Sequence, residues 1–307
     1  MVSFGLLAQQ PVNAATPAAE ARASGPPAAV DLRPTFDAFG IVPRKQGERP
    51  TCSVFTVVGA LEFAAAKRQG HTPRLSVEFL NWAANKACGE MEDGGYFSDL
   101  WKGFIAYGIC AEANMPYEAK LDTNRQPSAV ALADAKTRLP LDLRLHWIKE
   151  WNVNTGLTAE HLTAIKQTLD SGWPVCSGLR WPKQQQWVDN VLQMCPSNAV
   201  RDGHSVLLVG YRDDAAQPGG GVFIFRNTSR SGQDGWMPYA YAREYMNDAV
   251  WVDFERRTNA PTAPAAVSPL RRDPLGALTT LPAGRNRPIS SNEQPKAGLN
   301  AGLAGAI

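Results

Sequence analysis

The 307-residue chain has little of what marks several protein classes. Its formal net charge is only +2, so it lacks the basic excess that binds nucleic acid or an anionic membrane surface. No apolar run approaches the roughly 20 residues that cross a bilayer. No group of cysteines and histidines has the spacing of a zinc site. We therefore expect no nucleic acid, no membrane and no metal among its partners.

Cysteine is scarce and scattered, which excludes a dense disulfide framework. The five cysteines are an odd number, so at least one thiol stays free unless it pairs with another chain. Cys88 and Cys110 can pair in a secreted protein. Cys176 lies in a strand-like run typical of a core, and Cys195 lies in a loop where a free thiol is expected. The pairing of these four stays open.

The two ends of the chain differ in composition from its middle. Residues 1–29 are rich in Ala and Pro without helical or strand periodicity, which predicts a flexible leader or a short pro-segment. The apolar stretch at the start is short and has no Lys or Arg before it, so a secreted or periplasmic location stays open. Residues 257–307 are rich in Ala, Pro and Gly and predict a disordered tail. The folded unit is expected over residues 30–256.

Hydrophobic periodicity predicts helices in the first part of the chain. Residues 52–69 are apolar around most of the helix circumference, which is typical of a central, buried helix. Thr51 and Gly70 stand where an N-cap and a C-cap are expected. Cys52 then lies in the first turn, where the helix dipole and the unpaired N–H groups lower the pKa of a thiol. Further helices are predicted after Ser76, over 96–107 and over 158–169.

After about residue 140 the pattern changes to strands. The expected strands are 175–179, 206–211, 222–226 and 250–254. Helices first and strands later predict the α+β class, with a helical lobe over about 45–130 and a β lobe over about 140–256.

Two of these strands bring a histidine and an asparagine together. Residues 213–221 are rich in Asp, Pro and Gly, so the strands on either side are predicted to form an antiparallel hairpin. If Tyr211 faces Gly220, the same register places His204 opposite Asn227. An amide beside an imidazole can fix its tautomer. Together with the Cys52 thiol, these are the parts of a nucleophilic cysteine hydrolase.

At this point the sequence resembles a known family, the papain-like cysteine peptidases, in a divergent and bacterial form. The resemblance extends from Val30 to about Phe254 and includes the flanks of His204 and Asn227. Its other motifs are Val30–Pro34, Gln46–Gly47, Leu75–Leu80, Asp93–Tyr96, Tyr107–Ile109, Met115–Tyr117, Trp173–Val175 and Asp234–Tyr239.

The resemblance implies a two-lobe fold and an endopeptidase. The helical lobe would carry Cys52 on its central helix and pack against an antiparallel β-barrel-like lobe, with the active-site cleft between them. Cys52 would be the nucleophile and His204 the general base and then the general acid. Asn227 would orient His204. Gln46 and the backbone N–H of Cys52 would form the oxyanion hole. The substrate would be a polypeptide, and no cofactor is implied.

Five further positions are implied to bind substrate. Gly94 and Gly95 would pair with the substrate backbone, because a close approach leaves no room for a Cβ. Tyr96, Gly178 and Ser205 would line the pocket for the second residue upstream of the cleaved bond.

The chain also departs from the family pattern. Ser53 stands where the family has Trp after the nucleophile, and no Trp follows Asn227. Arg49 and Glu92 stand at two positions where the family has disulfide-bonded cysteines, so we hypothesise an ion pair between them. Residues 1–29 are shorter than the family's propeptide, and self-inhibition by this segment is one expectation.

Two alternatives to an endopeptidase stay open. The same three groups can serve a transferase, deamidase or ligase if an amine outcompetes water. The absent tryptophans also allow a catalytically silent peptide-binding module.

Overall fold

The computed structural model describes residues 27–254, apart from residues 73, 139–142, 153, 155, 230 and 231. These residues belong to a compact unit that spans Met1–Arg257. The expected tail over 257–307, and all but the last three residues of the expected leader, lie outside the described residues. No helix within the described ranges is long and apolar enough to cross a membrane.

Helix α2 (Cys52–Gln69) is the central element, and it begins and ends at the predicted residues. Most of its side chains are buried, and Gly70 closes it in the left-handed conformation with φ 79°. Thr51 is the N-cap residue as expected, but among the described residues its side chain makes no capping hydrogen bond. The Thr51 hydroxyl is instead 2.7 Å from the Tyr117 hydroxyl, so its role is to hold a neighbouring loop.

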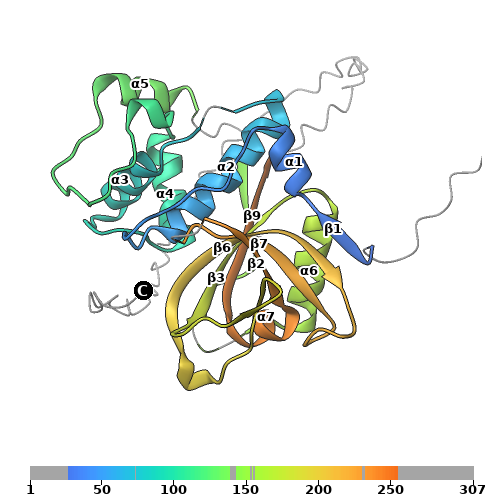
Figure 1. Ribbon diagram of the computed structural model, residues 1–307. Helices are drawn as coiled ribbons and strands as arrows, with labels where there is room; N and C mark the ends of the chain where they lie inside the picture. The colour runs from blue at the N-terminus through green and yellow to red at the C-terminus, as the bar shows by residue number, and fades with distance from the viewer. Residues whose placement is uncertain are drawn as a thin grey trace, which may run out of the picture. The chain divides into compact units, whose positions relative to one another are not determined.

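The other helices are shorter than α2. Those anticipated from periodicity are α3 (Val77–Cys88), α4 (Phe97–Tyr107) and α6 (Ala159–Asp170). The short helices α1 (Arg33–Ala38), α5 (Ala129–Lys136) and α7 (Tyr239–Tyr245) and the 3-10 turns η1 (Glu112–Asn114) and η2 (Ser197–Ala199) were not anticipated. Figure 1 shows α3, α4 and α5 on one side of α2 and the strands on the other.

The strands form one sheet, in the order β2-β9-β3-β6-β7-β8-β5-β4 with β1 against β6. All pairs are antiparallel except β5 with β8. The strands are β1 (Ala29–Asp31), β2 (Leu143–Lys149), β3 (Val175–Pro182), β4 (Trp187–Val188), β5 (Val191–Leu192), β6 (Val200–Asp213), β7 (Gly221–Arg226), β8 (Asp234–Pro238) and β9 (Met246–Phe254). The α+β class is confirmed, whereas the expected barrel-like lobe is an open sheet that ends at β2 and β4.

The predicted register of the β6–β7 hairpin is wrong. Tyr211 lies opposite Phe223, and a bulge between Leu208 and Gly210 shifts the pairing. The paired region stops at Leu207, well before His204. His204 therefore lies beyond the end of β7; its ladder partner is Leu179 of β3, and it meets Asn227 through the side chains alone.

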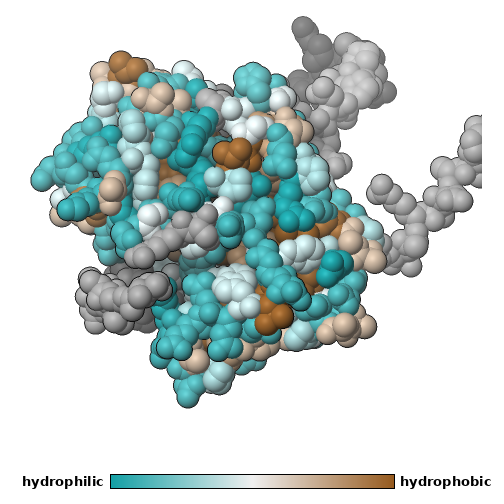
Figure 2. Space-filling model, viewed as in Figure 1, coloured by the Kyte–Doolittle hydropathy of each residue, from teal (hydrophilic) through white to brown (hydrophobic). Residues whose placement is uncertain are grey.

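The hydrophobic core lies on both faces of α2, which contacts β3, β6 and β9 on one side and α3 and α4 on the other. A smaller cluster lies between α3 and α5, around Phe79 and Met115. Figure 2 shows a mostly hydrophilic surface on which hydrophobic residues are scattered. The large exposed hydrophobic side chains include Val42, Met91, Ile105 and Val188, which lie on separate elements.

No disulfide forms within the described part of the chain, so the bond that a secreted protein could make between Cys88 and Cys110 is not seen. Cys176 is buried in β3, as its strand-like setting predicted. Cys195 is half-buried in the loop before η2.

The hypothesis of an ion pair between Arg49 and Glu92 is wrong: Arg49 is paired, but with other carboxylates. The Arg49 side chain is 4% exposed, and its guanidinium contacts Glu78 at 2.5 Å and Asp93 at 2.7 Å. It also lies over the Tyr117 ring, 4.7 Å from the centroid. The Glu92 side chain is exposed, and the backbone carbonyl of that residue accepts hydrogen bonds instead. A buried guanidinium needs buried carboxylates, and Glu92 cannot supply one.

The guanidinium of Arg49 is expected to be far more important to stability than the side chain of Glu92. Arg49→Ala leaves two buried carboxylates without their cation and should lower the free energy of unfolding by about 3–5 kcal/mol. Glu92→Ala removes an exposed side chain and should change it by less than about 0.5 kcal/mol. Urea unfolding measures both. Equal losses in the two variants would contradict this assignment.

Candidate functional site

The Cys52 thiol lies beside the residues that flank His204. Cys52 is 8% exposed at the start of α2, and its Sγ atom is 3.8 Å from the carbonyl oxygen of Gly203. Ser205 lies close enough to lower the pKa of the same thiol. Because Gly203 and Ser205 are the neighbours of His204, the fold brings the thiol and the imidazole to one place.

Burial favours the uncharged forms of both groups. Desolvation raises the pKa of the Cys52 thiol, although hydrogen bonds from Ser205 and Ser53 oppose the shift. The expected lowering by the helix start is therefore outweighed by burial. Desolvation also lowers the pKa of His204 to about 4, against the hydrogen bond that its ring donates to Asn227 and together with the charge of Arg201. Burial thus works against a thiolate–imidazolium ion pair.

Asn227 holds the ring of His204 and sets its tautomer. The Asn227 Oδ1 atom is 3.1 Å from His204 Nε2 and also accepts the backbone N–H of Ser229 at 3.1 Å. A backbone N–H can only donate, so the shared atom must be the amide oxygen. Nε2 therefore carries the hydrogen, which leaves Nδ1 of the neutral ring as an acceptor. Asn227 is only 4% exposed, so this bond is protected from water.

An unanticipated tryptophan packs on the same ring. The Trp181 indole lies 4.5 Å from the His204 ring, centroid to centroid, and is 2% exposed. The strand was predicted to end at Leu179, but β3 continues to Pro182 with a bulge between Leu179 and Trp181. Such a bulge re-aims a side chain. Trp181 thus covers the imidazole although no tryptophan follows Asn227.

The side chain of Gln46, which lies before α2, is held by Thr228, which follows β7 on the other side of the site. Its Oε1 accepts the hydroxyl of Thr228 at 2.9 Å, and its backbone N–H bonds to the Thr228 carbonyl at 2.7 Å. Its Nε2 donates one hydrogen to the carbonyl of Arg49 at 2.9 Å. An amide nitrogen carries two hydrogens, so one is left for another acceptor. Thr228 was missed from the sequence, where its place next to Asn227 was the only signal.

Gly94 and Gly95 lie against the segment before the nucleophile. A Cβ on Gly94, which has φ +83°, would lie 2.7 Å from the carbonyl oxygen of Pro50. The Gly94 N–H donates to Asn81 Oδ1 at 3.0 Å, so this buried asparagine of α3 positions the loop. A Cβ on Gly95, which has φ +143°, would meet no atom within 4 Å. The backbone of Gly95 therefore has open space beside it.

The other three predicted substrate-binding residues lie on neighbouring elements. Ser205 of β6 is opposite Gly178 of β3, and Gly178 is in turn opposite Asp248 of β9. Tyr96 immediately precedes α4, and its ring packs edge-on against Trp151 at 5.3 Å. Burial raises the pKa of Tyr96, and the nearby charge of Asp248 adds to the shift. Asp248 was not anticipated, because nothing in the sequence showed that β9 lies beside β3.

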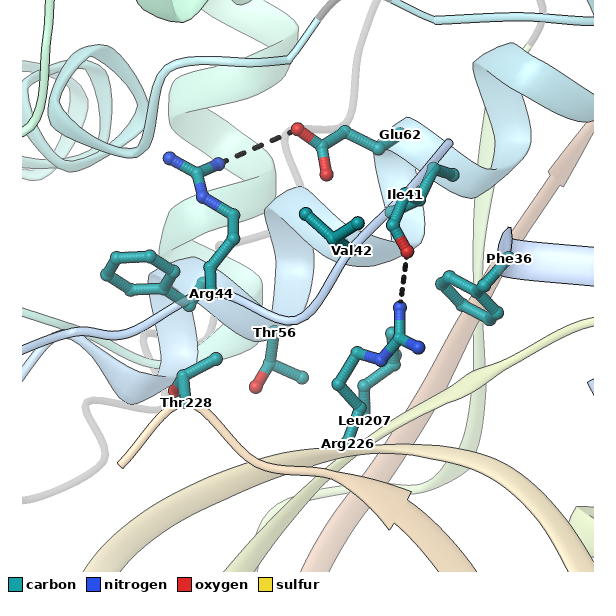
Figure 3. A pocket seen from close by; sticks show the side chains of 11 residues that line it. Phe36, Ile41, Val42, Arg44, Thr56, Glu62, Leu207, Arg226 and Thr228 are labelled. Atoms are coloured by element: carbon teal, nitrogen blue, oxygen red, sulfur yellow. Dashed lines mark hydrogen bonds and ion pairs between the residues drawn. The ribbon is translucent and has the colours of Figure 1, made fainter. Parts of the chain in front are cut away.

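A small cavity borders this network without reaching the thiol. Figure 3 shows Arg44 directed toward Glu62 and Arg226 directed toward the backbone of Ile41. The ion pair between Arg44 and Glu62 measures 3.6 Å, and burial raises the pKa of Glu62. Thr228 is the lining residue that the cavity shares with the network. In the described ranges, no group of His, Cys, Asp or Glu side chains is arranged to hold a metal ion.

Several solved structures share this fold. Xylellain, a cysteine protease from Xylella fastidiosa, matches with a TM-score of 0.58 and 23% identity over 76% of this chain and 88% of its own. Procathepsin L 3 from the larval midgut of Tenebrio molitor matches with a TM-score of 0.52 and 20% identity over 76% and 72% of the two chains. The proform of the ragweed pollen protease Amb a 11 matches at 0.54 and 21% over 76% and 69%. These likenesses confirm the predicted papain-like fold.

A comparison with curated proteins found no match. The family model for papain family cysteine proteases matches residues 26–252, which is most of the sequence. On that match, and with the expected fold around a buried thiol, the chain belongs to the papain family of cysteine proteases.

Proposed function

We propose that the protein is a cysteine endopeptidase that hydrolyses peptide bonds through an acyl-thioester on Cys52. The observation that carries the proposal is the contact of the Cys52 thiol with the carbonyl oxygen of Gly203, the residue directly before a histidine that Asn227 holds. A nucleophile, a base and a group that orients the base are the minimum for this chemistry. Family membership supports the same reaction class.

The first half of the reaction forms the thioester. His204 Nδ1 takes the proton of the thiol while Sγ attacks the carbonyl carbon of the scissile bond. The carbonyl oxygen becomes an oxyanion, for which the backbone N–H of Cys52 and the remaining Nε2 hydrogen of Gln46 are the donors. The intermediate then collapses, the C–N bond breaks, and the imidazolium returns its proton to the leaving amine.

The second half releases the acid. His204 takes a proton from water, whose oxygen attacks the thioester carbonyl carbon. The C–S bond breaks, and the sulfur recovers its proton from the imidazolium. During both halves Asn227 stabilises the charged ring through Nε2, and Trp181 keeps water from one face of it.

Substrate would lie along Gly94 and Gly95, with Tyr96, Gly178 and Ser205 around the side chain of the second upstream residue. Open space beside Gly95 supports the backbone part of this arrangement. Self-inhibition by the N-terminal segment stays a prediction, since residues 1–26 lie outside the described residues. Two of the similar structures, procathepsin L 3 and the Amb a 11 proform, are of precursor forms.

Affinity labelling tests the proposal. A peptidyl epoxide should alkylate Cys52 in preference to the other four thiols, because Cys52 contacts the residue next to His204, the proposed base. His204→Ala keeps the thiol and should lose most of the rate, which makes it the matched control. Equal labelling of all five cysteines would point to the silent binding module. Mass spectrometry of peptide products then separates hydrolysis from transfer to an amine.

The oxyanion hole gives a second prediction. Gln46→Ala should lower kcat by about 10²–10³-fold with a smaller effect on KM, since the bond forms in the transition state. Thr228→Val should reproduce part of that loss by freeing the Gln46 side chain, and Thr228→Ser, which keeps the hydroxyl, should not. Loss of activity in the serine variant as well would contradict the positioning role of Thr228.

The acid limb of the pH profile gives a third prediction. The base must be neutral, so kcat/KM should rise as pH increases through the pKa of His204, which is about 4. The Asn227 hydrogen bond raises the pKa of His204. Asn227→Ala should therefore move the acid limb to lower pH while the plateau falls. A limb that moves to higher pH would show that Asn227 does not stabilise the charged ring.

A further inference from the structure

A row of residues leads from the thiol to a buried carboxylate. Ser205, Gly178 and Asp248 are direct cross-strand partners on β6, β3 and β9. Directly opposed residues of antiparallel strands place their side chains on the same face of a sheet. The side chain of Ser205 lowers the pKa of the Cys52 thiol, so Asp248 lies on the face of the sheet nearest the proposed nucleophile. Two strand spacings put Asp248 about 10 Å from Ser205 along the row.

The Asp248 carboxylate covers the position where Gly178 has no side chain. It accepts the Gly178 N–H through Oδ1 at 2.8 Å, and a Cβ on Gly178 would lie 2.2 Å from that oxygen. Asp248 is only 4% exposed. Among the described residues, no hydrogen-bond donor is recorded on its second oxygen, Oδ2. The row of Ser205, Gly178 and Asp248 therefore ends at a carboxylate whose Oδ2 atom is available to accept a hydrogen bond.

The nearest cation does not neutralise this acid by direct contact. Lys149 of β2 lowers the pKa of Asp248 through its charge, but no ion pair between described residues joins the two. The Lys149 ammonium instead donates to the backbone carbonyls of Asn247 and Glu150. A buried carboxylate without a paired cation is costly, and a cation brought by a ligand relieves that cost.

An aromatic ring lies within electrostatic range of the acid, and a second ring packs against the first. Tyr96 is close enough to Asp248 for its pKa to respond to the carboxylate, and its ring packs on Trp151. A flat guanidinium stacks on such rings while its N–H groups bond a carboxylate. The combination suits an arginine side chain better than an apolar one.

We propose that Asp248 is the specificity-determining residue of the enzyme and selects arginine or lysine as the second residue upstream of the cleaved bond. The proposal rests on the proposed function, because it needs the substrate to lie over Tyr96, Gly178 and Ser205.

The preference should depend on pH. Burial raises the pKa of Asp248 to about 7, against the hydrogen bond from Gly178 and the charge of Lys149. The other titratable groups that respond to Asp248 are Lys149 on β2, Tyr96 before α4 and Cys176 on β3. Burial raises the pKa values of Tyr96 and Cys176, so both stay neutral near pH 7. Asp248 then gains its charge as pH rises through about 7, and selection for a basic side chain rises with it.

The experiment compares two fluorogenic dipeptide coumarins with the same residue at the cleaved bond and either arginine or leucine upstream of it. The full-length protein should cleave the arginine substrate with the higher kcat/KM, and the ratio should rise from pH 6 to pH 8. Asp248→Asn keeps the acceptor for Gly178 but not the charge. It should lower the ratio by about 10- to 100-fold, the range for a hydrogen bond to a charged group.

Asp253→Asn makes the same chemical change elsewhere on β9 and should leave the ratio unchanged. Thermal unfolding shows whether each variant is folded. Epoxide labelling of Cys52 in every variant separates the two proposals. If Cys52 is labelled but the enzyme shows no arginine preference, the proposed role of Asp248 is overturned and the proposed function is not. The same holds if the preference survives Asp248→Asn. Absence of both labelling and cleavage in the unmodified protein overturns the proposed function instead.

Discussion

The geometry around the nucleophile depends on one buried guanidinium. Arg49 contacts Glu78 of α3 and Asp93 of the loop before α4, and it donates to the carbonyl of Glu118. Three separate segments are thereby fixed to the turn that leads into Cys52. The backbone carbonyl of Arg49 also holds the amide of Gln46. At the position where the resemblance implied a disulfide, the chain has a cluster of charged groups whose contribution to stability depends on their burial away from water.

The two sides of the site meet through short polar contacts rather than through the core alone. Gln46 is bonded to Thr228 by main chain and side chain, and the Cys52 sulfur contacts the carbonyl oxygen of Gly203. Thr228 directly follows Asn227, which holds His204. The proposed base and the proposed oxyanion donor are therefore tied to the same short segment at the end of β7.

The sequence predicted those features of the fold that depend on neighbouring residues, such as the ends of a helix and the pairing of two strands joined by a turn. The bounds of α2 followed from its apolar character and Gly70, and the antiparallel pairing of β6 with β7 from the turn between them. The contact of His204 with Asn227 was anticipated through a register that proved wrong, because bulges cannot be seen in the sequence. The partners of Arg49 and the place of Asp248 depend on contacts between distant segments, which periodicity does not encode.

Burial of the reacting pair has a consequence for when charge appears. Desolvation raises the pKa of Cys52 and lowers the pKa of His204, so burial works against an ion pair in the resting site. In the proposed reaction, charge develops as Sγ attacks, and the Asn227 oxygen then faces an imidazolium while the start of α2 faces an oxyanion. Interactions that strengthen only at that stage lower the activation free energy without making the enzyme bind its substrate more tightly. Burial makes the free thiol a weaker nucleophile. In the proposed reaction it also means that Asn227 and the start of α2 act mainly on charge that forms in the transition state.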